Sequence, residues 1–415
     1  AARGRVKAYD LKDGKQVWMC HSTGSDKDVC LTADTNKANP HYGTAGTDLG
    51  IKTHVGEDWK IGGGAAWGWF TYDSDLKMVY YSTGNPGLWS PAYRCSKKTH
   101  DECNTGEFDN KWSMTIFARK VENGEAVWAY QMTPFDQWDY DGVNENILMD
   151  MDVDGKKRKA LVHFDRNGFQ YLMDRVDGTL LRANKYVTVD WAEKVDLKTG
   201  RPVKVREHSP LERGRNVAAC PSAMGGKDQQ PCSMDPKEPT KAYCPTNNWC
   251  MELEPQERSH TNQGTVYVFA NVFMFPEKPG TTGKIKKFDV VTGKTDWEIP
   301  DQYPNWGGTL VTDGGLMFYA SLGGDFRAVD RKSGKILWSR KLASGSIANP
   351  ITYKVKGKQY VSILVGIGGW IGVPVTAGLD LNDKFGAIGA TAMTKAANLD
   401  KIPQAGTLFT FRVYE

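Results

Sequence analysis

A short motif recurs along this 415-residue chain and constrains its fold more than any other feature. In each clear copy an Asp precedes a Trp by eight residues, and a Gly precedes the same Trp by four. The clear copies run from Ala8 to Trp18, Phe288 to Trp297 and Ala328 to Trp338; degenerate copies run from Ala118 to Trp128, which keeps Gly124, and from Leu172 to Arg182, which keeps Asp174 and Gly178. Each copy predicts a strand, a tight turn and a second strand. The Asp can accept hydrogen bonds from turn amides, the Gly can adopt positive φ, and the indole can be buried against a neighbour.

The spacing of the motif predicts how many units the chain holds. The last positions of successive copies are separated by 110, 54, 115 and 41 residues. For blades of about 40 to 55 residues, the two long intervals hold two units each, so we expect roughly six or seven blades. Closing such an array into a propeller removes exposed strand edges. We therefore predict an all-β fold with residues 1–415 in a single β-propeller domain. Separate stacked β-sandwiches are the alternative, but no Pro- or Ser-rich linker divides the chain.

Two segments are too long to be hairpin turns. They are residues 86–110, which contain Cys95 and Cys103, and residues 184–262, which contain four cysteines and many prolines. Long excursions from a propeller sit at one mouth of the ring and build a site there. We expect functional residues near both segments.

Charge and hydropathy exclude two classes of partner. The net charge is +4 with basic and acidic residues interspersed, which gives no electrostatic footprint for nucleic acid. The longest uncharged stretch, Tyr360 to Leu379, is long enough to cross a bilayer but is rich in Gly and contains Pro374. We expect buried strand and turn there, and no membrane span.

The cysteines favour disulfide bonds. There are eight, several in close couples, and none forms a CxxC pair; the seven histidines show no ligand spacing, so a structural zinc site is not expected. Disulfides would place the protein in an oxidising compartment such as the bacterial periplasm. Reduced, buried thiols are the alternative.

A pair of carboxylates near the middle of the chain suits a hard metal ion. In an extended segment, Asp139 and Asp141 would face one side together while Tyr140 points away. Two such carboxylates repel each other unless a cation or a shared proton lies between them. A solvated surface loop is the alternative for the pair taken alone.

Several motifs in order along the chain resemble the quinoprotein alcohol dehydrogenases, and most closely the methanol dehydrogenases. The motifs are Gly62-Gly63-Gly64-Ala65-Ala66-Trp67-Gly68-Trp69, Ser82-Thr83-Gly84-Asn85-Pro86, Trp138-Asp139-Tyr140-Asp141-Gly142-Val143-Asn144, His163-Phe164-Asp165-Arg166-Asn167-Gly168-Phe169, Gly225-Gly226-Lys227-Asp228-Gln229-Gln230, Asn247-Asn248-Trp249-Cys250-Met251-Glu252 and Trp306-Gly307-Gly308-Thr309-Leu310. The resemblance covers nearly the whole chain. It implies an eight-bladed propeller with tryptophan-docking motifs and the tricyclic quinone PQQ on its axis.

The resemblance assigns roles to individual residues. Asp139 matches the catalytic base, and Asn85, Asp139 and Asp141 match metal ligands. Asp141 matches the additional carboxylate of the lanthanide-dependent branch, where the calcium-dependent branch has Ala. A trivalent ion of calcium's size favours the extra anionic oxygen.

The remaining matches are to the cofactor. Trp67 matches the indole floor beneath PQQ, Arg166 matches the guanidinium that bonds the quinone oxygens, and Asp228 and Trp306 match further cofactor neighbours. Singly, each residue has a structural alternative: the indoles could be core residues, Asn85 could shape a turn, and Arg166 could pair with Asp165 or Asp174 at the surface.

The implied protein is a periplasmic enzyme that oxidises methanol or other primary alcohols with PQQ and a lanthanide ion, with calcium as the alternative metal. It would pass electrons to a soluble cytochrome c and form a homodimer. A calcium-type or ethanol-oxidising quinoprotein is a second possibility. A non-catalytic propeller scaffold is a third, and it would not need Asp139, Asn85, Arg166 and Asp141 together.

The chain also departs from the family pattern. The family's metal-binding Glu belongs just before the motif that opens this chain, so we expect the N-terminal part, with its first blades, to be absent from it. Ala65 stands where many relatives have Thr, and the Cys95–Cys103 segment lengthens the path from Asn85 to Trp112. The family's ring-spanning disulfide would correspond to Cys220–Cys250, leaving Cys232–Cys244, Cys95–Cys103 and Cys20–Cys30 as the other pairs.

Overall fold

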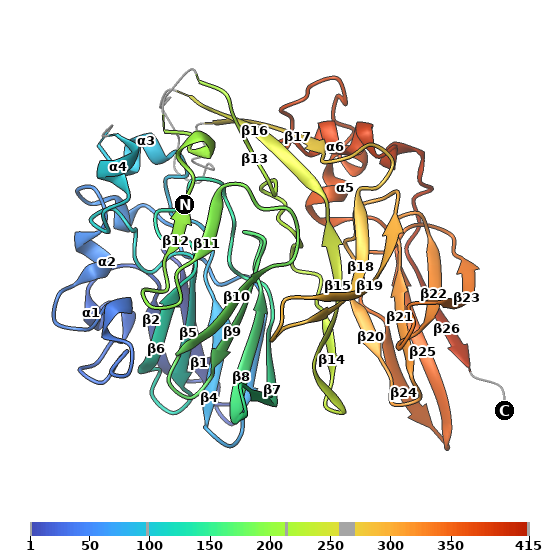
Figure 1. Ribbon diagram of the computed structural model, residues 1–415, viewed down its shortest axis with the longest axis horizontal. Helices are drawn as coiled ribbons and strands as arrows, with labels where there is room; N and C mark the ends of the chain where they lie inside the picture. The colour runs from blue at the N-terminus through green and yellow to red at the C-terminus, as the bar shows by residue number, and fades with distance from the viewer. Residues whose placement is uncertain (1, 97–98, 212–214, 257–269, 413–415) are drawn as a thin grey trace. The chain divides into compact units, whose positions relative to one another are not determined.

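The computed structural model describes residues 2–96, 99–211, 215–256 and 270–412. Strands predominate (Figure 1). The chain divides into two compact units. The first comprises Ala1–Lys185, Val189–Ala219 and Glu252–Asn271, and the second comprises Tyr186–Thr188, Cys220–Met251 and Val272–Glu415. Two strands, β16 (Trp249–Pro255) and β17 (Ala270–Pro276), contain chain boundaries between the units.

The first unit is built around two four-stranded antiparallel sheets, ordered β3-β4-β5-β6 and β10-β9-β8-β7. Their strands are β3 (Phe70–Asp73), β4 (Met78–Ser82), β5 (Thr115–Lys120), β6 (Ala126–Gln131), β7 (Asn146–Val153), β8 (Lys156–Phe164), β9 (Phe169–Asp174) and β10 (Leu180–Lys185). The two sheets meet at β3 and β7, where the Thr71 hydroxyl donates to the Asn146 carbonyl over 2.7 Å.

Shorter elements complete the first unit. Two hairpins pair β1 (Arg5–Tyr9) with β2 (Gln16–His21) and β11 (Ala192–Val195) with β12 (Pro202–Lys204). The others are β13 (Val217–Ala219), α1 (Asp26–Val29), α2 (Leu49–Lys52), α3 (Pro91–Arg94), α4 (His100–Cys103), and the 3₁₀ turns η1 (Pro40–Tyr42), η2 (Asp58–Lys60) and η3 (Arg206–His208).

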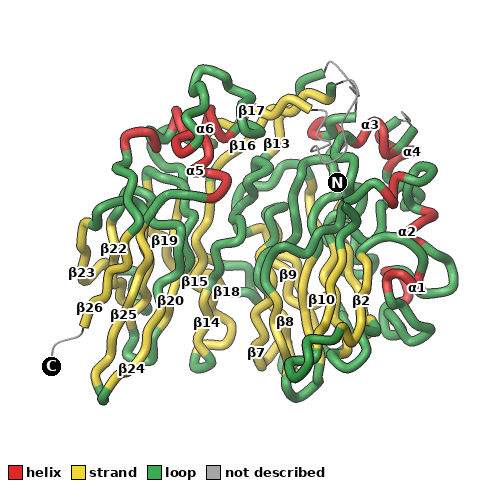
Figure 2. Tube along the Cα trace, turned by 180° about the vertical axis from the view of Figure 1, so that it is seen from behind, coloured by secondary structure: helices red, strands yellow, loops and turns green. Residues whose placement is uncertain are grey.

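The second unit holds two four-stranded sheets, ordered β14-β15-β18-β19 and β20-β21-β22-β23, and a three-stranded sheet, β24-β25-β26. Its strands are β14 (Ser233–Asp235), β15 (Glu238–Asn247), β18 (Gly283–Asp289), β19 (Thr295–Asp301), β20 (Thr309–Val311), β21 (Leu316–Ala320), β22 (Asp325–Asp330), β23 (Ile336–Lys341), β24 (Ile351–Val355), β25 (Lys358–Val365) and β26 (Thr407–Arg412). Figure 2 shows α5 (Gly369–Thr376) and α6 (Ala390–Ala396) together at one end of these sheets, next in the chain to η4 (Leu399–Lys401).

The recurring motif forms the same antiparallel hairpin in all five copies. The paired positions are Ala8 with Trp18, Ala118 with Trp128, Leu172 with Arg182, Lys287 with Trp297, and Ala328 with Trp338. As predicted, the motif Asp accepts turn amides: Asp10 accepts from Lys12 at 2.8 Å, and Asp289 accepts from Thr292 at 2.8 Å. The motif glycines have φ between 70° and 78°.

Three motif indoles pack against a later turn within the same unit. The Trp128 indole donates to the Arg175 carbonyl at 3.0 Å, and a Cβ placed on Gly178 would lie 2.8 Å from its ring. Trp18 makes the same pair of contacts with Val121 and Gly124, and Trp297 makes them with Arg331 and Gly334. Trp338 differs, because its indole is 40% exposed and contacts Phe326 and Phe411.

The two long intervals differ in their contents. Among described residues, the interval from Trp18 to Trp128 holds one four-stranded sheet, because short helices and irregular chain occupy residues 22–69. The interval from Arg182 to Trp297 holds a four-stranded sheet, the three-stranded sheet β13-β16-β17 and the β11–β12 hairpin. The range 184–262 includes β14 and β15, and only part of it is therefore an excursion; its last residues, 257–262, lie outside the described residues.

The structure shows how the cysteines pair and which elements the uncharged stretch forms. Four disulfides join Cys20–Cys30, Cys95–Cys103, Cys220–Cys250 and Cys232–Cys244, the pairs that the resemblance implied. The stretch Tyr360–Leu379 forms most of β25 and then α5, a helix rather than the expected turn. Within the described ranges, no helix has the length and apolarity needed to cross a membrane.

Candidate active site

The two central carboxylates lie in a loop between β6 and β7, not in an extended strand. Asp139 has φ of +64°, a left-handed conformation that Asp tolerates better than most residues. The alternation expected of an extended segment is therefore wrong at this position. Local side-chain hydrogen bonds to the backbone favour a turn over a strand here.

Asp136 makes those hydrogen bonds. Its buried carboxylate accepts from the amide of Trp138 at 3.2 Å, from the amide of Asp139 at 3.1 Å and from the amide of Tyr140 at 3.4 Å. Burial raises the pKa of this carboxyl, and the nearby Arg94 guanidinium and the amide bonds act in the opposite direction. Asp136 thus shapes the loop that presents Asp139, and the sequence reading did not single it out.

Asp141 joins two other predicted residues. One carboxylate oxygen accepts from the Asn85 amide at 2.6 Å, and the other lies 3.7 Å from the Arg166 guanidinium. The surface alternative for Arg166 is wrong, since its side chain is buried, while Asp174 pairs with Arg158 and Asp165 contacts His163. Three residues that are far apart in the sequence therefore meet at one carboxylate.

Trp67 borders the same group. The Arg166 guanidinium lies 5.3 Å from the centre of the Trp67 ring, within range of a cation–π contact. Gly84 lies against both Asp141 and Trp67, because a Cβ there would overlap the Asp141 carboxylate and lie 3.4 Å from the Trp67 indole nitrogen. Trp67 nevertheless keeps 45% of its surface exposed, which is unusual for an indole beside buried residues and leaves it available to stack on a planar molecule.

Asp228 and Trp306, the other two predicted cofactor residues, belong to the second unit. Both are buried, and Trp306 is 2% exposed. The Asp228 amide donates to the Gln230 side chain at 3.1 Å, and the Gln230 amide group donates to the Asn305 carbonyl at 2.8 Å, next to Trp306. Their roles at the cofactor stay predictions.

Comparison with known proteins identifies the family. The model of the glucose/ethanol/alcohol dehydrogenase β-propeller domain, named PQQ, matches residues 1–195 and 298–361. The chain belongs to this PQQ family. It is 46% identical over 408 residues to the lanthanide-dependent methanol dehydrogenase of Methylacidiphilum fumariolicum strain SolV, covering 97% of this chain and 64% of that relative.

Two further proteins are similar to this PQQ-family chain. Subunit 1 of the methanol dehydrogenase [cytochrome c] of Methylorubrum extorquens strain AM1 is 42% identical, with 98% of this chain and 64% of that protein covered. A europium-containing methanol dehydrogenase of known structure superposes with a TM-score of 0.93 at 45% identity, covering 99% of this chain and 70% of that one. The chain thus spans less than two thirds of the curated relatives it matches.

The residues present fit a hard metal ion and a planar anionic cofactor. Asn85, Asp139 and Asp141 would supply oxygen ligands only, the type that calcium and lanthanide ions bind. Among the described residues no group of three or more His, Cys, Asp or Glu lies close enough to hold a metal. The exposed Trp67 ring beside the buried Arg166 offers an aromatic face and a positive charge to the cofactor.

Proposed function

We propose that this chain is part of a PQQ-dependent methanol dehydrogenase that uses a lanthanide ion. The observation that carries the proposal is the position of Asp141 between the Asn85 amide and the Arg166 guanidinium. This contact joins the carboxylate matched to the lanthanide branch to one residue proposed as a metal ligand and to one proposed as a cofactor-binding residue. The relative at 46% identity is a lanthanide-dependent methanol dehydrogenase, which supports the proposal.

Each proposed site residue of this chain would have a separate role in the reaction. PQQ, when bound, supplies a two-electron acceptor, and the metal supplies a Lewis acid. Asp139 would accept the hydroxyl proton of the alcohol, which requires an ionised carboxylate within hydrogen-bond reach. Arg166 would stabilise negative charge on the cofactor, Trp67 would stack against its ring, and Asn85 and Asp141 would hold the metal with Asp139.

A lanthanide suits this ligand set better than calcium. The second carboxylate adds a full negative charge, and a trivalent ion gains more from it than a divalent ion of the same size. Calcium is the alternative metal, because it also binds oxygen ligands of this type.

We also propose the finer features of the fold and its setting. The three indole-to-turn contacts of Trp18, Trp128 and Trp297 support tryptophan docking between successive blades of one eight-bladed propeller domain, of which this chain holds six or seven blades. The four disulfides support a periplasmic location. Cytochrome c as electron acceptor is supported by the similarity to subunit 1 of the methanol dehydrogenase [cytochrome c], and a homodimer stays a prediction.

The test is the metal preference of the full-length protein that contains this chain. We expect methanol oxidation at least about tenfold faster with lanthanum or cerium than with calcium, and an absorption band of bound quinone. The Asp141→Ala variant should lose this preference, whereas Asp154→Ala, which removes an exposed ion pair with Arg182, should keep it. Equal rates with both metals would refute the lanthanide assignment. A bare protein spectrum after reconstitution would favour the scaffold alternative.

A further inference from the structure

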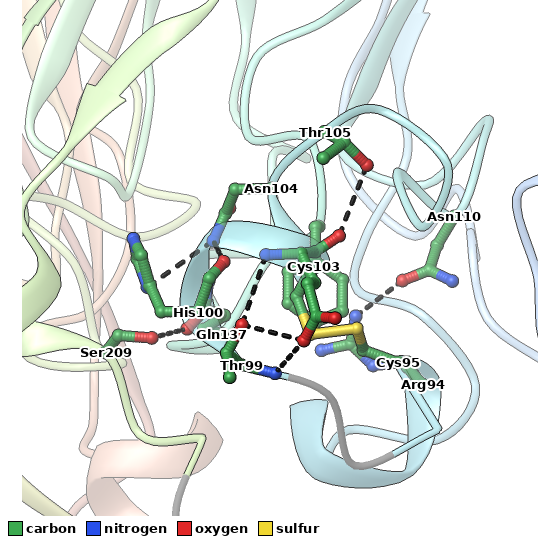
Figure 3. The surroundings of a disulfide bond; sticks show 12 residues. Arg94, Cys95, Thr99, His100, Cys103, Asn104, Thr105, Asn110, Gln137 and Ser209 are labelled. Carbon is green, nitrogen blue, oxygen red and sulfur yellow. Dashed lines mark hydrogen bonds between the residues drawn. A yellow bond between two sulfur atoms is a disulfide. The ribbon is translucent and has the colours of Figure 1, made fainter.

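The 86–110 segment contacts the loop that carries Asp139 through packing against Phe135, through a backbone hydrogen bond from Phe135 to Asp109, and through the buried Arg94. Arg94 ends α3, directly before the Cys95–Cys103 disulfide within this segment (Figure 3). Its guanidinium donates to the Asn110 side chain at 2.5 Å, to the Trp89 carbonyl at 2.9 Å, and to the carbonyl of Asp136. Burial lowers the pKa of Arg94 to about 10, and the carboxylates of Asp136, Asp139 and Asp58 act against this shift.

A buried lysine from the other excursion holds the preceding carbonyls. Lys204, in β12, donates to the Pro134 carbonyl at 2.6 Å and to the Phe135 carbonyl at 3.0 Å. It also donates at 2.7 Å to the side chain of Asn104, which directly follows α4 and Cys103. Three consecutive carbonyls, from Pro134 to Asp136, therefore accept from Lys204 or Arg94. Burial lowers the pKa of Lys204 to about 7, so Arg94 is the fully charged donor of the two. A carbonyl bonded to a charged donor is held more strongly than one bonded to a neutral donor.

The loop beyond these carbonyls is tied to the same surroundings. The Ser209 hydroxyl donates to the Gln137 side chain (Figure 3), and the Trp138 indole donates to the His208 carbonyl at 2.8 Å. Lys204 lies over the rings of Phe135 and Trp138 at 5.4 and 5.8 Å. Beyond Trp138 comes Asp139, whose amide is held by Asp136.

We propose that Arg94 and Lys204 are positioning residues for Asp139. They hold the backbone of residues 134–136, and this backbone carries the Asp136 carboxylate that sets Asp139 in its left-handed conformation. The two long excursions of the chain thus each contribute one residue that positions Asp139, the proposed base and metal ligand. The inference rests on the proposed function, because it assigns the two residues to the same site.

The experiment compares two buried arginines of the first unit. Arg94→Met in the full-length protein removes the guanidinium that reaches Asp136. Arg119→Met removes one that donates instead to Tyr81, Val29 and Gly124 in the β1–β6 region. Terbium ion alone, detected by tryptophan-sensitised luminescence, reports metal affinity, and hydrogen exchange reports the amides of residues 138–140. Steady-state kinetics with methanol complete the set.

For Arg94→Met we expect terbium affinity at least about tenfold weaker, kcat at least about tenfold lower, KM within about threefold, and faster exchange at residues 138–140. Arg94→Lys should recover part of each loss, because it restores a cation but not the forked geometry. Arg119→Met should leave terbium affinity and exchange at residues 138–140 near wild type. Lys204→Met should repeat the Arg94→Met pattern more weakly.

Two results would overturn the inference. One is equal loss of terbium affinity in Arg94→Met and Arg119→Met, which would indicate general destabilisation. The other is unchanged exchange at residues 138–140 in both Arg94→Met and Lys204→Met. If Arg94→Met fails to fold, Lys204→Met and the double variant Cys95→Ala/Cys103→Ala, with Cys20→Ala/Cys30→Ala as its control, decide the question by the same readouts. A wild-type protein that neither oxidises methanol nor binds terbium would refute the proposed function instead, and exchange would still test the loop.

Discussion

The backbone amide of Asn85 donates to the carboxylate of Asp141 over 2.6 Å, which joins the chain just after β4 to the loop just before β7. The two residues are 56 positions apart in the sequence. A short, charge-assisted bond of this kind fixes the carboxylate in direction as well as position. Because this bond uses the backbone amide of Asn85, the side chain of the same residue can still serve as a ligand in the proposed metal site.

Gly84→Ala tests how closely this contact is packed. A Cβ at Gly84 would overlap the Asp141 carboxylate, so we expect the carboxylate to move and terbium affinity to fall about tenfold or more. The overlap should also lower the free energy of unfolding by roughly 1–3 kcal/mol. Gly314→Ala is the control, because a Cβ there meets nothing within 4 Å. Similar terbium affinity in the two variants would contradict the close packing.

Asp136→Ala tests the turn that presents Asp139. The three amides of residues 138–140 would lose a buried acceptor, so the free energy of unfolding measured with denaturant should fall by about 3 kcal/mol. Asp196→Ala is a matched change, since Asp196 also accepts from two turn amides, those of Lys198 and Thr199, but at an exposed turn. Water can replace it there, and we expect a much smaller loss. Comparable losses would mean that burial of Asp136 contributes little.

Gly178→Ala tests the contact between a motif indole and the next turn. Gly178 has φ of +78° and Gly155 has φ of +74°, so replacement by Ala costs roughly 1 kcal/mol of backbone strain at either site. Only Gly178 also faces a ring, that of Trp128 at 2.8 Å from the added Cβ. We expect Gly178→Ala to lower the free energy of unfolding by about 1–3 kcal/mol more than Gly155→Ala. Equal losses of unfolding free energy in the two variants would show that the Trp128 ring moves aside without destabilising the protein.

Lys111 should make stability depend on pH. Burial lowers its pKa to about 8, with Asp109 opposing the shift and Arg201 adding to it, and its ammonium donates to the Tyr42 carbonyl at 2.7 Å. Between about pH 8 and pH 10.5 the unfolded chain binds more protons at this residue than the folded protein, so folding becomes more favourable as pH rises through that window.

The measurement is the unfolding free energy of wild type minus that of Lys111→Met, followed from pH 7.5 to 10.5. This difference should increase by up to about 3 kcal/mol, because each unit of pKa shift corresponds to about 1.4 kcal/mol. Groups common to both proteins cancel in the subtraction. A difference that stays constant across the window would mean that the pKa of Lys111 is not lowered in the folded state.

Local patterns in the sequence predicted the hairpins well. The Asp, Gly and Trp of each motif act within about ten residues, through turn hydrogen bonds and positive φ, so their effect is visible before the rest of the chain is known. The contents of the long intervals were not predictable in this way. Residues 22–69 form short helices and irregular chain, and no spacing rule distinguishes such a stretch from another set of strands.

At the active site, the sequence by itself determined which residue types are present and which motifs they match. It also placed Asp141 and Asp139 two positions apart, but it could not decide how the segment folds. The left-handed Asp139 depends on Asp136, and the backbone of Asp136 depends on Arg94, a residue 42 positions earlier and directly before the Cys95–Cys103 disulfide. The meeting of Asn85, Asp141 and Arg166 likewise requires two sheets to be in place. Such contacts depend on packing between distant parts of the chain, and for this reason only the tertiary structure decided them.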